Sequence, residues 1–308
     1  MKQDDRGARH PIRVAAERTG LSPHVLRAWE RRYGVVTPLR TEGGQRFYTD
    51  DDIRRLSLLN KASHAGRAVG QIAQMSTDEL AQLVAQDADQ GAARLPVAAD
   101  HRALAMAAVR DMAPDRLRAV LHRALLSLGT TAFLDSVLTP ILQDVGTEWH
   151  AGRIGIAHEH AASAAVEQLL AWLVQELQGA PDAPHVLLAT PAGQRHTQGA
   201  LIAAVAAAHD GWRVTWLGAD LPAAQISAAA TRHSADVVGL SVATAESADQ
   251  LRAEVDALRD SLNARTPLYV GGMAASVVAG ADEVTVVRDL THWRNLLRSH
   301  ATSRPNAA

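Results

Sequence analysis

The sequence of 308 residues contains no cysteine. This absence excludes disulfide bonds, iron–sulfur clusters and metal sensing through thiolates, and it suits a reducing compartment. Aromatic residues are also scarce, at 4%, whereas the apolar fraction of 47% is typical of a globular protein with alanine-rich helices.

Long hydrophobic segments are absent as well. Residues 1–6 have no apolar core region and do not resemble a signal peptide. The longest apolar run, residues 200–208, is far too short to span a bilayer. We therefore expect a cytoplasmic protein without membrane contact, and its length predicts two or three domains.

The formal net charge of −2 conceals an uneven distribution. Residues 1–75 contain 14 Lys or Arg and 8 Asp or Glu, whereas the remainder contains 17 and 25. A basic N-terminal part joined to an acidic body is typical of a DNA-binding module linked to a sensing module. The alternative is a chance division of surface charge.

The N-terminal part has the pattern of a winged helix-turn-helix. Helices are predicted at residues 12–19 and 23–33, with Ser22 as the N-cap of the second helix and Pro23 as its first residue. Two short strands surround a Gly-Gly turn within residues 38–48, and further helices begin near Asp50 and Val69.

In this motif the second helix lies in the major groove with its N-terminal residues nearest the bases. The expected groove contacts are Ser22, His24 and Arg27. The expected phosphate contacts are Arg40, Arg46 and the hydroxyl of Tyr48. The alternative for each arginine is a solvated surface, and Trp29 is expected in the core.

The middle of the chain is helical. Residues 76–96 are a polar connector rich in Ala, Gln and Asp, and residues 97–178 are predicted to form a four-helix bundle. Apolar residues recur there at helical spacing. Examples are Leu117, Val120, Leu121 and Leu125, then Phe133, Val137, Ile141 and Val145, and finally Leu169, Leu170 and Leu173.

After residue 179 the hydrophobic period changes to that of strands alternating with helices. Strands are predicted at residues 185–189, 213–217, 236–241, 268–270 and 283–287. This βαβ series predicts an α/β domain with a doubly wound parallel sheet over residues 179–300.

His196 is the main candidate for a functional residue, because it follows the first of these strands. Its loop is at the carboxyl edge of the sheet, where open α/β folds bind ligands. A neutral imidazole there can reach a metal above the sheet, and Gly199 lets a bulky ring approach the backbone.

The N-terminal part resembles the MerR family of transcriptional regulators over about residues 11–75. The resemblance rests on the run Arg-Ala-Trp-Glu-Arg-Arg-Tyr-Gly at residues 27–34, followed by Pro38, Arg40, Gly44, Arg46 and Tyr48. It implies dimeric binding to a palindromic operator in double-stranded DNA. Many members sense metals through cysteines, so the signal for this chain is expected to enter through its other domains.

The bundle and sheet resemble cobalamin-binding modules. Their signature of Asp/Glu-x-His-x-x-Gly, a serine at a later strand end and a Gly-Gly loop corresponds here to Gln194, His196, Gly199, Ser241, Gly271 and Gly272. The resemblance implies that His196 is the lower axial ligand of cobalt. Ser241 and the two later glycines would line the pocket for the nucleotide tail.

Two features depart from that signature. Gln194 replaces the acidic residue that would orient the imidazole, and an amide oxygen accepting the imidazole N–H would polarise it less. Only ten residues, 273–282, separate Gly272 from the last predicted strand, which leaves little room for a full helix.

Nearly the whole chain resembles the CarH/LitR class of light-responsive repressors that bind adenosylcobalamin. The particular mark is Trp149, nine intervening residues, then Glu159 and His160. In that class the tryptophan covers the adenosyl face, and the Glu and His contact the adenosyl group or its surroundings. His150 falls at the position of a histidine that captures cobalt after photolysis.

Other interpretations of these residues remain open. A tryptophan in a bundle is ordinarily a core residue. His158 and His160 could form a metal pair, although residues two apart do not share a helix face.

The resemblance implies a repressor that binds its operator as an adenosylcobalamin-loaded tetramer in the dark and releases it when light cleaves the cobalt–carbon bond. One alternative is a regulator of the same build that senses another chromophore, another cobalamin form or a partner protein. A cobalamin enzyme is the other alternative, but it needs a substrate barrel of roughly 250 residues, for which no chain remains.

Overall fold

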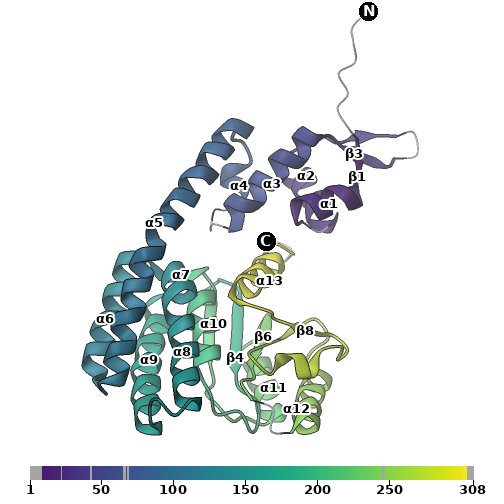
Figure 1. Cartoon of the computed structure of the whole chain (residues 1–308). Helices are drawn as coiled ribbons and strands as arrows, with labels where there is room; N and C mark the ends of the chain where they lie inside the picture. The colour runs from purple at the N-terminus through teal and green to yellow at the C-terminus, as the bar shows by residue number, and fades with distance from the viewer. Residues whose placement is uncertain are drawn as a thin grey trace, which may run out of the picture. The chain divides into compact units, whose positions relative to one another are not determined.

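The structure of the chain is a computed structural model that describes residues 9–303 apart from 22, 42–43, 65–66, 68 and 245–246 (Figure 1). The side chains of residues 24, 64, 88–96, 302 and 303 also lie outside this description. The chain divides into two compact units, Met1–Pro96 and Val97–Ala308, which are described separately.

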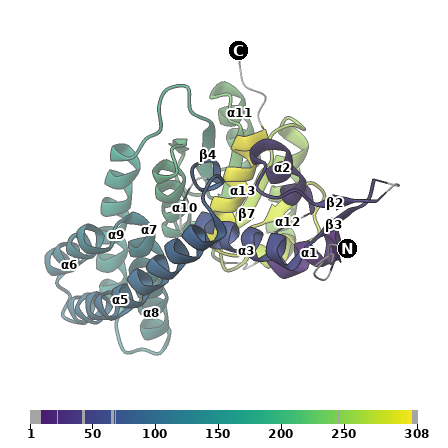
Figure 2. The ribbon, with the colours of Figure 1, turned by 90° about the horizontal axis from the view of Figure 1, so that it is seen from above.

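The first unit has the predicted winged helix-turn-helix. Its elements are β1 (His10–Pro11), α1 (Ile12–Thr19), α2 (Pro23–Tyr33), β2 (Leu39–Arg40), β3 (Arg46–Tyr48), α3 (Asp50–His64) and α4 (Val69–Ile72). The strands form an antiparallel sheet in the order β1-β3-β2, with the hairpin of β2 and β3 as the wing (Figure 2). Strand β1 was not expected from the sequence, because two residues that include a proline give no strand pattern.

The core of this unit joins the helices to the wing. Leu26 of α2, Tyr48 of β3, and Leu56 and Leu59 of α3 are fully buried. Gly20 adopts a φ of 70° between α1 and α2, a left-handed conformation that glycine accepts without steric cost. The tight turn that the helix-turn-helix requires therefore forms at this glycine.

The helical region begins with α5 (Thr77–Arg110), which includes the segment predicted as a connector. It continues with α6 (Pro114–Leu128), α7 (Thr130–Phe133), the π-helical segment η1 (Leu134–Leu138), α8 (Thr139–His150) and α9 (Ile156–Glu176). The elements α7, η1 and α8 follow one another without a break, and they correspond to the single helix that the sequence predicted there. Pro140 follows η1 and has no N–H to close a regular α-helical bond, which accounts for the local widening.

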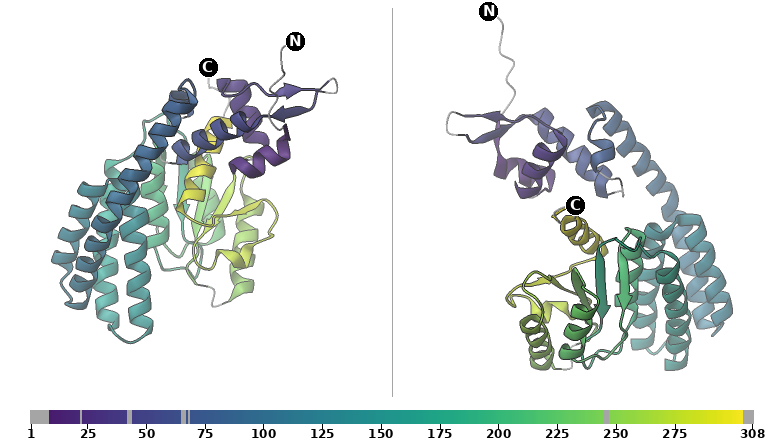
Figure 3. Two further views of the ribbon diagram at one scale, coloured as in Figure 1. Left: turned by 45° about the horizontal axis from the view of Figure 1, so that its top comes forward. Right: turned by 180° about the vertical axis from the view of Figure 1, so that it is seen from behind.

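The C-terminal part is the predicted doubly wound domain (Figure 3). Its strands are β4 (His185–Ala189), β5 (Arg213–Trp216), β6 (Val237–Ser241), β7 (Leu268–Gly271) and β8 (Val284–Val286), all parallel in the order β5-β4-β6-β7-β8. The helices are α10 (Gln198–His209), α11 (Ala223–Arg232), α12 (Ala248–Ser261) and α13 (Leu290–Ser303).

Alternate residues of β4 face two separate cores, as the two-residue period of a strand requires. Val186 and Leu188 belong to the core that includes α10, α13 and the bundle, whereas Leu187 and Ala189 belong to the core under α11 and α12. A sheet covered on both faces explains why β4 is apolar and buried throughout.

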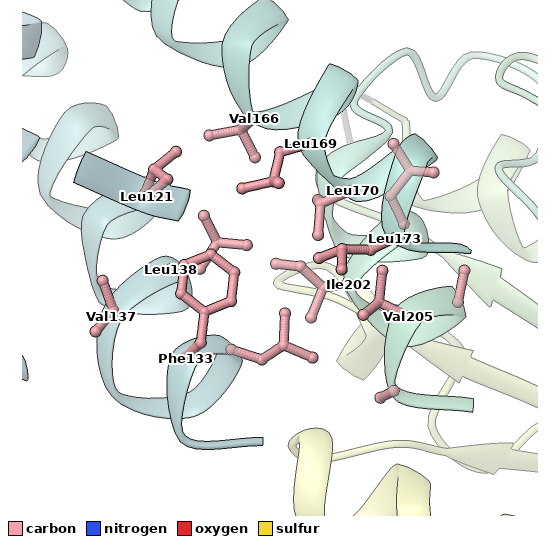
Figure 4. Packing of buried hydrophobic residues seen from close by; sticks show 14 of the residues in the cluster. Leu121, Phe133, Val137, Leu138, Val166, Leu169, Leu170, Leu173, Ile202 and Val205 are labelled. Atoms are coloured by element: carbon pink, nitrogen blue, oxygen red, sulfur yellow. The ribbon is translucent and has the colours of Figure 1, made fainter. Parts of the chain in front are cut away.

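Helix α9 joins the bundle to the sheet domain. Leu169, Leu170 and Leu173 pack beside Ile202 and Val205 of α10 (Figure 4). Apolar burial across this contact makes bundle and sheet parts of one unit.

Helices α9 and α10 run in the same direction. Glu167 contacts Thr197 and Gln198 at the start of α10, and Gln178, just past α9, bonds to the backbone of Val214 in β5. The first eleven residues of α9 therefore extend past the carboxyl edge of the sheet.

Candidate functional site

The carboxyl edge of the sheet has a topological switch point between β4 and β6. The chain leaves β4 toward β5 on one side, whereas β6 continues toward β7 on the other. Crevices at such points are the usual ligand sites of open α/β sheets. The loop carrying His196 follows β4, Ser241 ends β6, and Gly271 ends β7, so the structure gathers these predicted residues at one edge.

His196 is exposed on this loop, and Gln194 is not placed to orient it. The Gln194 side-chain oxygen instead accepts the backbone N–H groups of Ala243 at 2.9 Å and Thr244 at 3.2 Å. Both acceptor positions of that oxygen are therefore occupied. This corrects the expectation that the Gln194 amide oxygen accepts the imidazole N–H.

Close backbone approaches explain the small residues around His196. A Cβ atom on Gly199 would lie 2.6 Å from the hydroxyl oxygen of Ser241. Gly272 adopts a φ of 108°, and a Cβ there would lie 2.3 Å from the carbonyl oxygen of Val242. These glycines are required for the loops to pack.

The segment after Gly272 confirms the expectation that it is too short for a full helix. It forms only η2 (Ala275–Val278), a single 3₁₀ turn, before β8. Met273 at its start is 85% exposed.

The bundle contributes a second group of predicted residues, which we call the bundle tip (residues 149–160). It comprises the end of α8, the connecting turn and the start of α9. Glu159 lies eight residues before Glu167, so it stands about 12 Å beyond the start of α10 at the α-helical rise. The bundle tip is consequently placed on the ligand side of the sheet edge.

Trp149 is 40% exposed and therefore is not a core residue. Its ring lies 4.8 Å from the His150 ring in an edge-to-face arrangement. His150 Nδ1 lies 2.7 Å from the carbonyl oxygen of Gly146, and because a carbonyl only accepts, Nδ1 carries the proton. In neutral His150 the Nε2 lone pair is left available to a metal.

Glu159 is held by two neighbours. Ser163 donates its hydroxyl to one carboxylate oxygen at 2.6 Å, and His160 Nδ1 bonds to the other. The His160 side chain is 71% exposed. His158 Nδ1 accepts the Gly155 N–H at the start of α9, which accounts for this histidine as a helix cap. Within the described part of the chain, no three His, Asp or Glu residues converge as a metal site.

This arrangement suits a planar macrocycle that already holds its metal. His196 supplies one imidazole at the switch point, Trp149 offers a flat apolar surface, and Glu159 offers acceptor oxygens. Small residues at 199, 241 and 272 let the loops at this edge pack closely against one another. The residues present therefore fit a corrinoid.

In the first unit, Arg27 is exposed on α2, whereas Ser22 and the His24 side chain lie outside the described residues. Arg46 Nε contacts Glu30 Oε2 at 2.7 Å, and Arg40 contacts Glu30 Oε1 at 3.0 Å. The hydrogen bond between Arg46 and Glu30 raises the pKa of Arg46 above its usual value. Both wing arginines are thus held against α2 by one carboxylate.

The structure corrects the expected role of Tyr48. The Tyr48 side chain is fully buried, and its hydroxyl has no hydrogen-bond partner among the described residues. Burial, together with the Glu30 carboxylate, raises the pKa of this hydroxyl. Arg46 lies two residues before Tyr48 on the strand, so both side chains are on the face that is turned toward α2. The Tyr48 hydroxyl is therefore not available to a phosphate.

Two residues that position the sites were missed from the sequence. Glu30 lies within the run that carried the MerR resemblance, so that run contained a signal for it. Glu167 accepts bonds from Thr197 and Gln198 across 30 and 31 residues of sequence, and no local pattern indicates it.

Three family models match consecutive parts of the chain. The model described as MerR HTH family regulatory protein matches residues 11–79. Two models described as B12 binding domain match residues 104–173 and 184–288. The fold and the site thus define a DNA-binding regulator that carries a cobalamin-binding module.

Two relatives that match most of the chain come from Myxococcus xanthus. The HTH-type transcriptional repressor CarH is 37% identical over 86% of this chain and 89% of its own length. The HTH-type transcriptional repressor CarA is 34% identical over 86% of each chain. The monomethylamine corrinoid protein of Methanosarcina barkeri shares the fold with a TM-score of 0.53 and 14% identity, over 63% of this chain and 95% of its own.

The chain belongs to the CarH-type branch of the MerR family. It is a cobalamin-binding transcriptional regulator rather than an enzyme. None of its described helices has the length and apolar character needed to cross a bilayer.

Proposed function

We propose that this protein is a light-responsive transcriptional repressor. It binds its operator as an adenosylcobalamin-loaded tetramer in the dark, and illumination dissociates the tetramer and releases the DNA. The observation that supports this most is the placement of the bundle tip beyond the same sheet edge that carries His196. The names of the M. xanthus relatives support the repressor role.

The residues would divide the work between two faces of the cofactor. His196 would ligate cobalt, and Gly199, Ser241, Gly271 and Gly272 would accommodate the nucleotide tail. Bound adenosylcobalamin supplies a cobalt–carbon bond that light breaks. Trp149 covers the adenosyl group in the dark.

The remaining bundle-tip residues would act on the side of the cofactor opposite His196. Glu159 accepts hydrogen bonds from ribose hydroxyls, and His160 lies beside it. His150 is the proposed ligand after illumination, because its Nε2 is unprotonated in the neutral ring. Bound cofactor would stabilise one arrangement of the bundle and the sheet. If only that arrangement forms the tetramer, then cofactor binding and tetramer assembly are thermodynamically linked.

DNA binding would use the first unit. Arg27, with Ser22 and His24, is proposed for the groove, and Arg40 and Arg46 are proposed for phosphates. Several such units on one operator raise affinity through effective concentration. We further propose that the protein is cytoplasmic. The proposed domain limits are 1–75 for the DNA-binding domain, 76–96 for the connector, 97–178 for the four-helix bundle and 179–300 for the α/β domain.

The direct test is size-exclusion chromatography of the full chain with adenosylcobalamin, in the dark and after illumination. We expect a large species in the dark and a smaller one in light. His196→Ala should weaken uptake of adenosylcobalamin or shift its absorbance spectrum. An unchanged elution volume after illumination would exclude the switch.

A second candidate function is a repressor of the same build that senses another signal. Gln194 favours it, because the residue expected to orient the imidazole is engaged elsewhere. The absorbance spectrum of the purified protein distinguishes the two candidates. Adenosylcobalamin bands support the first candidate, and another chromophore supports the second.

A further inference from the structure

Gln194 is the most completely bonded residue of the loop that carries His196. Its side chain is buried, with the residue 6% exposed. The side-chain oxygen accepts from Ala243 and Thr244, and the side-chain nitrogen donates to the Thr244 carbonyl oxygen at 2.7 Å. Its backbone N–H donates to Pro191, and its carbonyl oxygen accepts from Thr190 and Asp220.

These bonds connect three loops at the carboxyl edge. Gln194 itself lies after β4, Asp220 lies after β5, and Ala243 and Thr244 lie after β6. Asp220 reinforces the connection, because one of its carboxylate oxygens accepts the Gly193 N–H at 2.8 Å. The exit loops of three adjacent strands therefore meet at one side chain and its backbone.

The chemistry of this junction requires an amide. The position must accept two N–H groups and donate one hydrogen to a carbonyl oxygen, and glutamine carries both functions on one planar group. An ionised glutamate of the same shape accepts but cannot donate. Its charge would be buried against the Thr244 carbonyl oxygen, which is unfavourable.

We propose that Gln194 is a positioning residue that fixes the His196 loop by clamping it to the loops after β5 and β6. It does not act by bonding to the imidazole. The part of this inference that concerns cobalt rests on the proposed function, whereas the clamp itself is a property of the protein alone. Restoring the acidic residue expected from cobalamin-binding modules therefore weakens the site.

The first experiment measures thermal unfolding of the full chain without cofactor between pH 5 and pH 8. Gln194→Glu removes the donor, Gln194→Met removes all three side-chain bonds, and Gln225→Glu is a matched control on the exposed surface of α11. At pH 8 we expect Gln194→Glu to lower Tm by about 5 °C relative to the control.

The pH dependence separates a clamp from a mere packing defect. A protonated glutamic acid can donate to Thr244, so folding favours that form and raises the pKa of the introduced carboxyl. Its stabilising contribution is present below the unfolded-state pKa of about 4.3 and is lost as pH rises through the folded-state value. The Tm deficit of Gln194→Glu therefore shrinks toward pH 5, whereas that of Gln194→Met does not change with pH.

The second experiment measures adenosylcobalamin binding in the dark by absorbance at pH 8 and pH 6. The clamp predicts about tenfold weaker binding to Gln194→Glu than to the unaltered chain at pH 8, with a smaller ratio at pH 6. An orienting role for residue 194 predicts the opposite, tighter binding to the glutamate variant at pH 8.

The two experiments fail independently. A Gln194→Glu variant as stable as Gln225→Glu at pH 8, or one that binds adenosylcobalamin more tightly than the unaltered chain, overturns the clamp. If the unaltered chain takes up no adenosylcobalamin, the proposed function fails, and the unfolding profiles still decide the role of Gln194.

Discussion

Gly199 and Ser241 approach so closely that a Cβ atom on the glycine would lie 2.6 Å from the serine hydroxyl oxygen. Gly199 is the second residue of α10, and its φ is not in the left-handed region, so its small size serves contact with β6. This contact sets how near the start of α10 comes to the strand beside the switch point.

The first prediction concerns this pair. Gly199→Ala should destabilise the protein by about 1–3 kcal/mol, because the added methyl group displaces Ser241. In a Ser241→Ala background the same change should stabilise by about 0.5–1 kcal/mol, because alanine favours the helix and the Ser241 Cβ lies at an ordinary 3.7 Å. Urea unfolding of the four proteins measures both effects. Equal effects in the two backgrounds would contradict the contact.

The second prediction concerns the wing. Arg40→Ala should lower operator affinity and reduce the slope of log K against log salt by about 0.9, because one phosphate contact is lost. Tyr48→Phe should leave affinity unchanged, because the buried hydroxyl reaches neither DNA nor a described partner. Fluorescence anisotropy at several salt concentrations provides the test, and reduced affinity in Tyr48→Phe would restore the original expectation.

The third prediction concerns pH. His185 is 3% exposed, its ring nitrogens contact the His233 carbonyl oxygen and Thr215, and burial lowers its pKa. Folding favours the neutral ring, so the free energy of unfolding should fall as pH drops below about 6.5 toward the lowered value. His185→Asn should flatten this part of the profile. Burial also lowers the pKa of His292, so a smaller dependence should remain.

The fourth prediction concerns an ion pair between the buried Arg294 and the more exposed Asp135. Arg294 of α13 is 7% exposed and contacts both oxygens of Asp135 at 3.0 and 3.2 Å. Asp135→Ala should cost about 1–3 kcal/mol, because the buried guanidinium is left without its counter-charge, although solvent reaches the Asp135 side of the pair. Arg294→Met should cost much less, since it removes the charge itself. Similar losses in the two variants, measured by urea unfolding, would contradict this asymmetry.

The fifth prediction concerns Trp149. Because this side chain is 40% exposed, Trp149→Ala should destabilise the cofactor-free protein by only about 1–2 kcal/mol, less than the loss of a fully buried tryptophan. It should weaken adenosylcobalamin binding more than hydroxocobalamin binding, because only the former presents an adenosyl group to the ring. Parallel titrations of the two cobalamins measure this difference. Equal weakening would remove Trp149 from the adenosyl face.

Local pattern predicted most of the fold. Strand β4 and helices α1 and α2 have their predicted limits, and the other sheet strands differ by at most one residue at an end. In these elements either the apolar residues recur at a regular spacing, or residues that favour the ends of helices and strands mark the limits. The π-helical segment before Pro140 was missed, because the apolar spacing on either side resembles that of a regular helix.

The site residues were harder to predict than the strands that carry them. His196 was identified from its position after a strand. The burial of Tyr48 was missed because Tyr48 shares a strand face with Arg46, which was expected to contact phosphates. The partners of Gln194 are 49 and 50 residues away, so no local rule reveals that its amide is already engaged. Such bonds depend on how three loops meet after the sheet has formed.

The junction at Gln194 has an evolutionary consequence. Three connections share one anchoring side chain, so an insertion in any of them would displace the other two. The connection between β7 and β8 has no such tie to Gln194 among the described residues, and its only helical part is a single 3₁₀ turn. Descendants of this fold should therefore keep constant lengths after β4, β5 and β6 and vary most freely after β7.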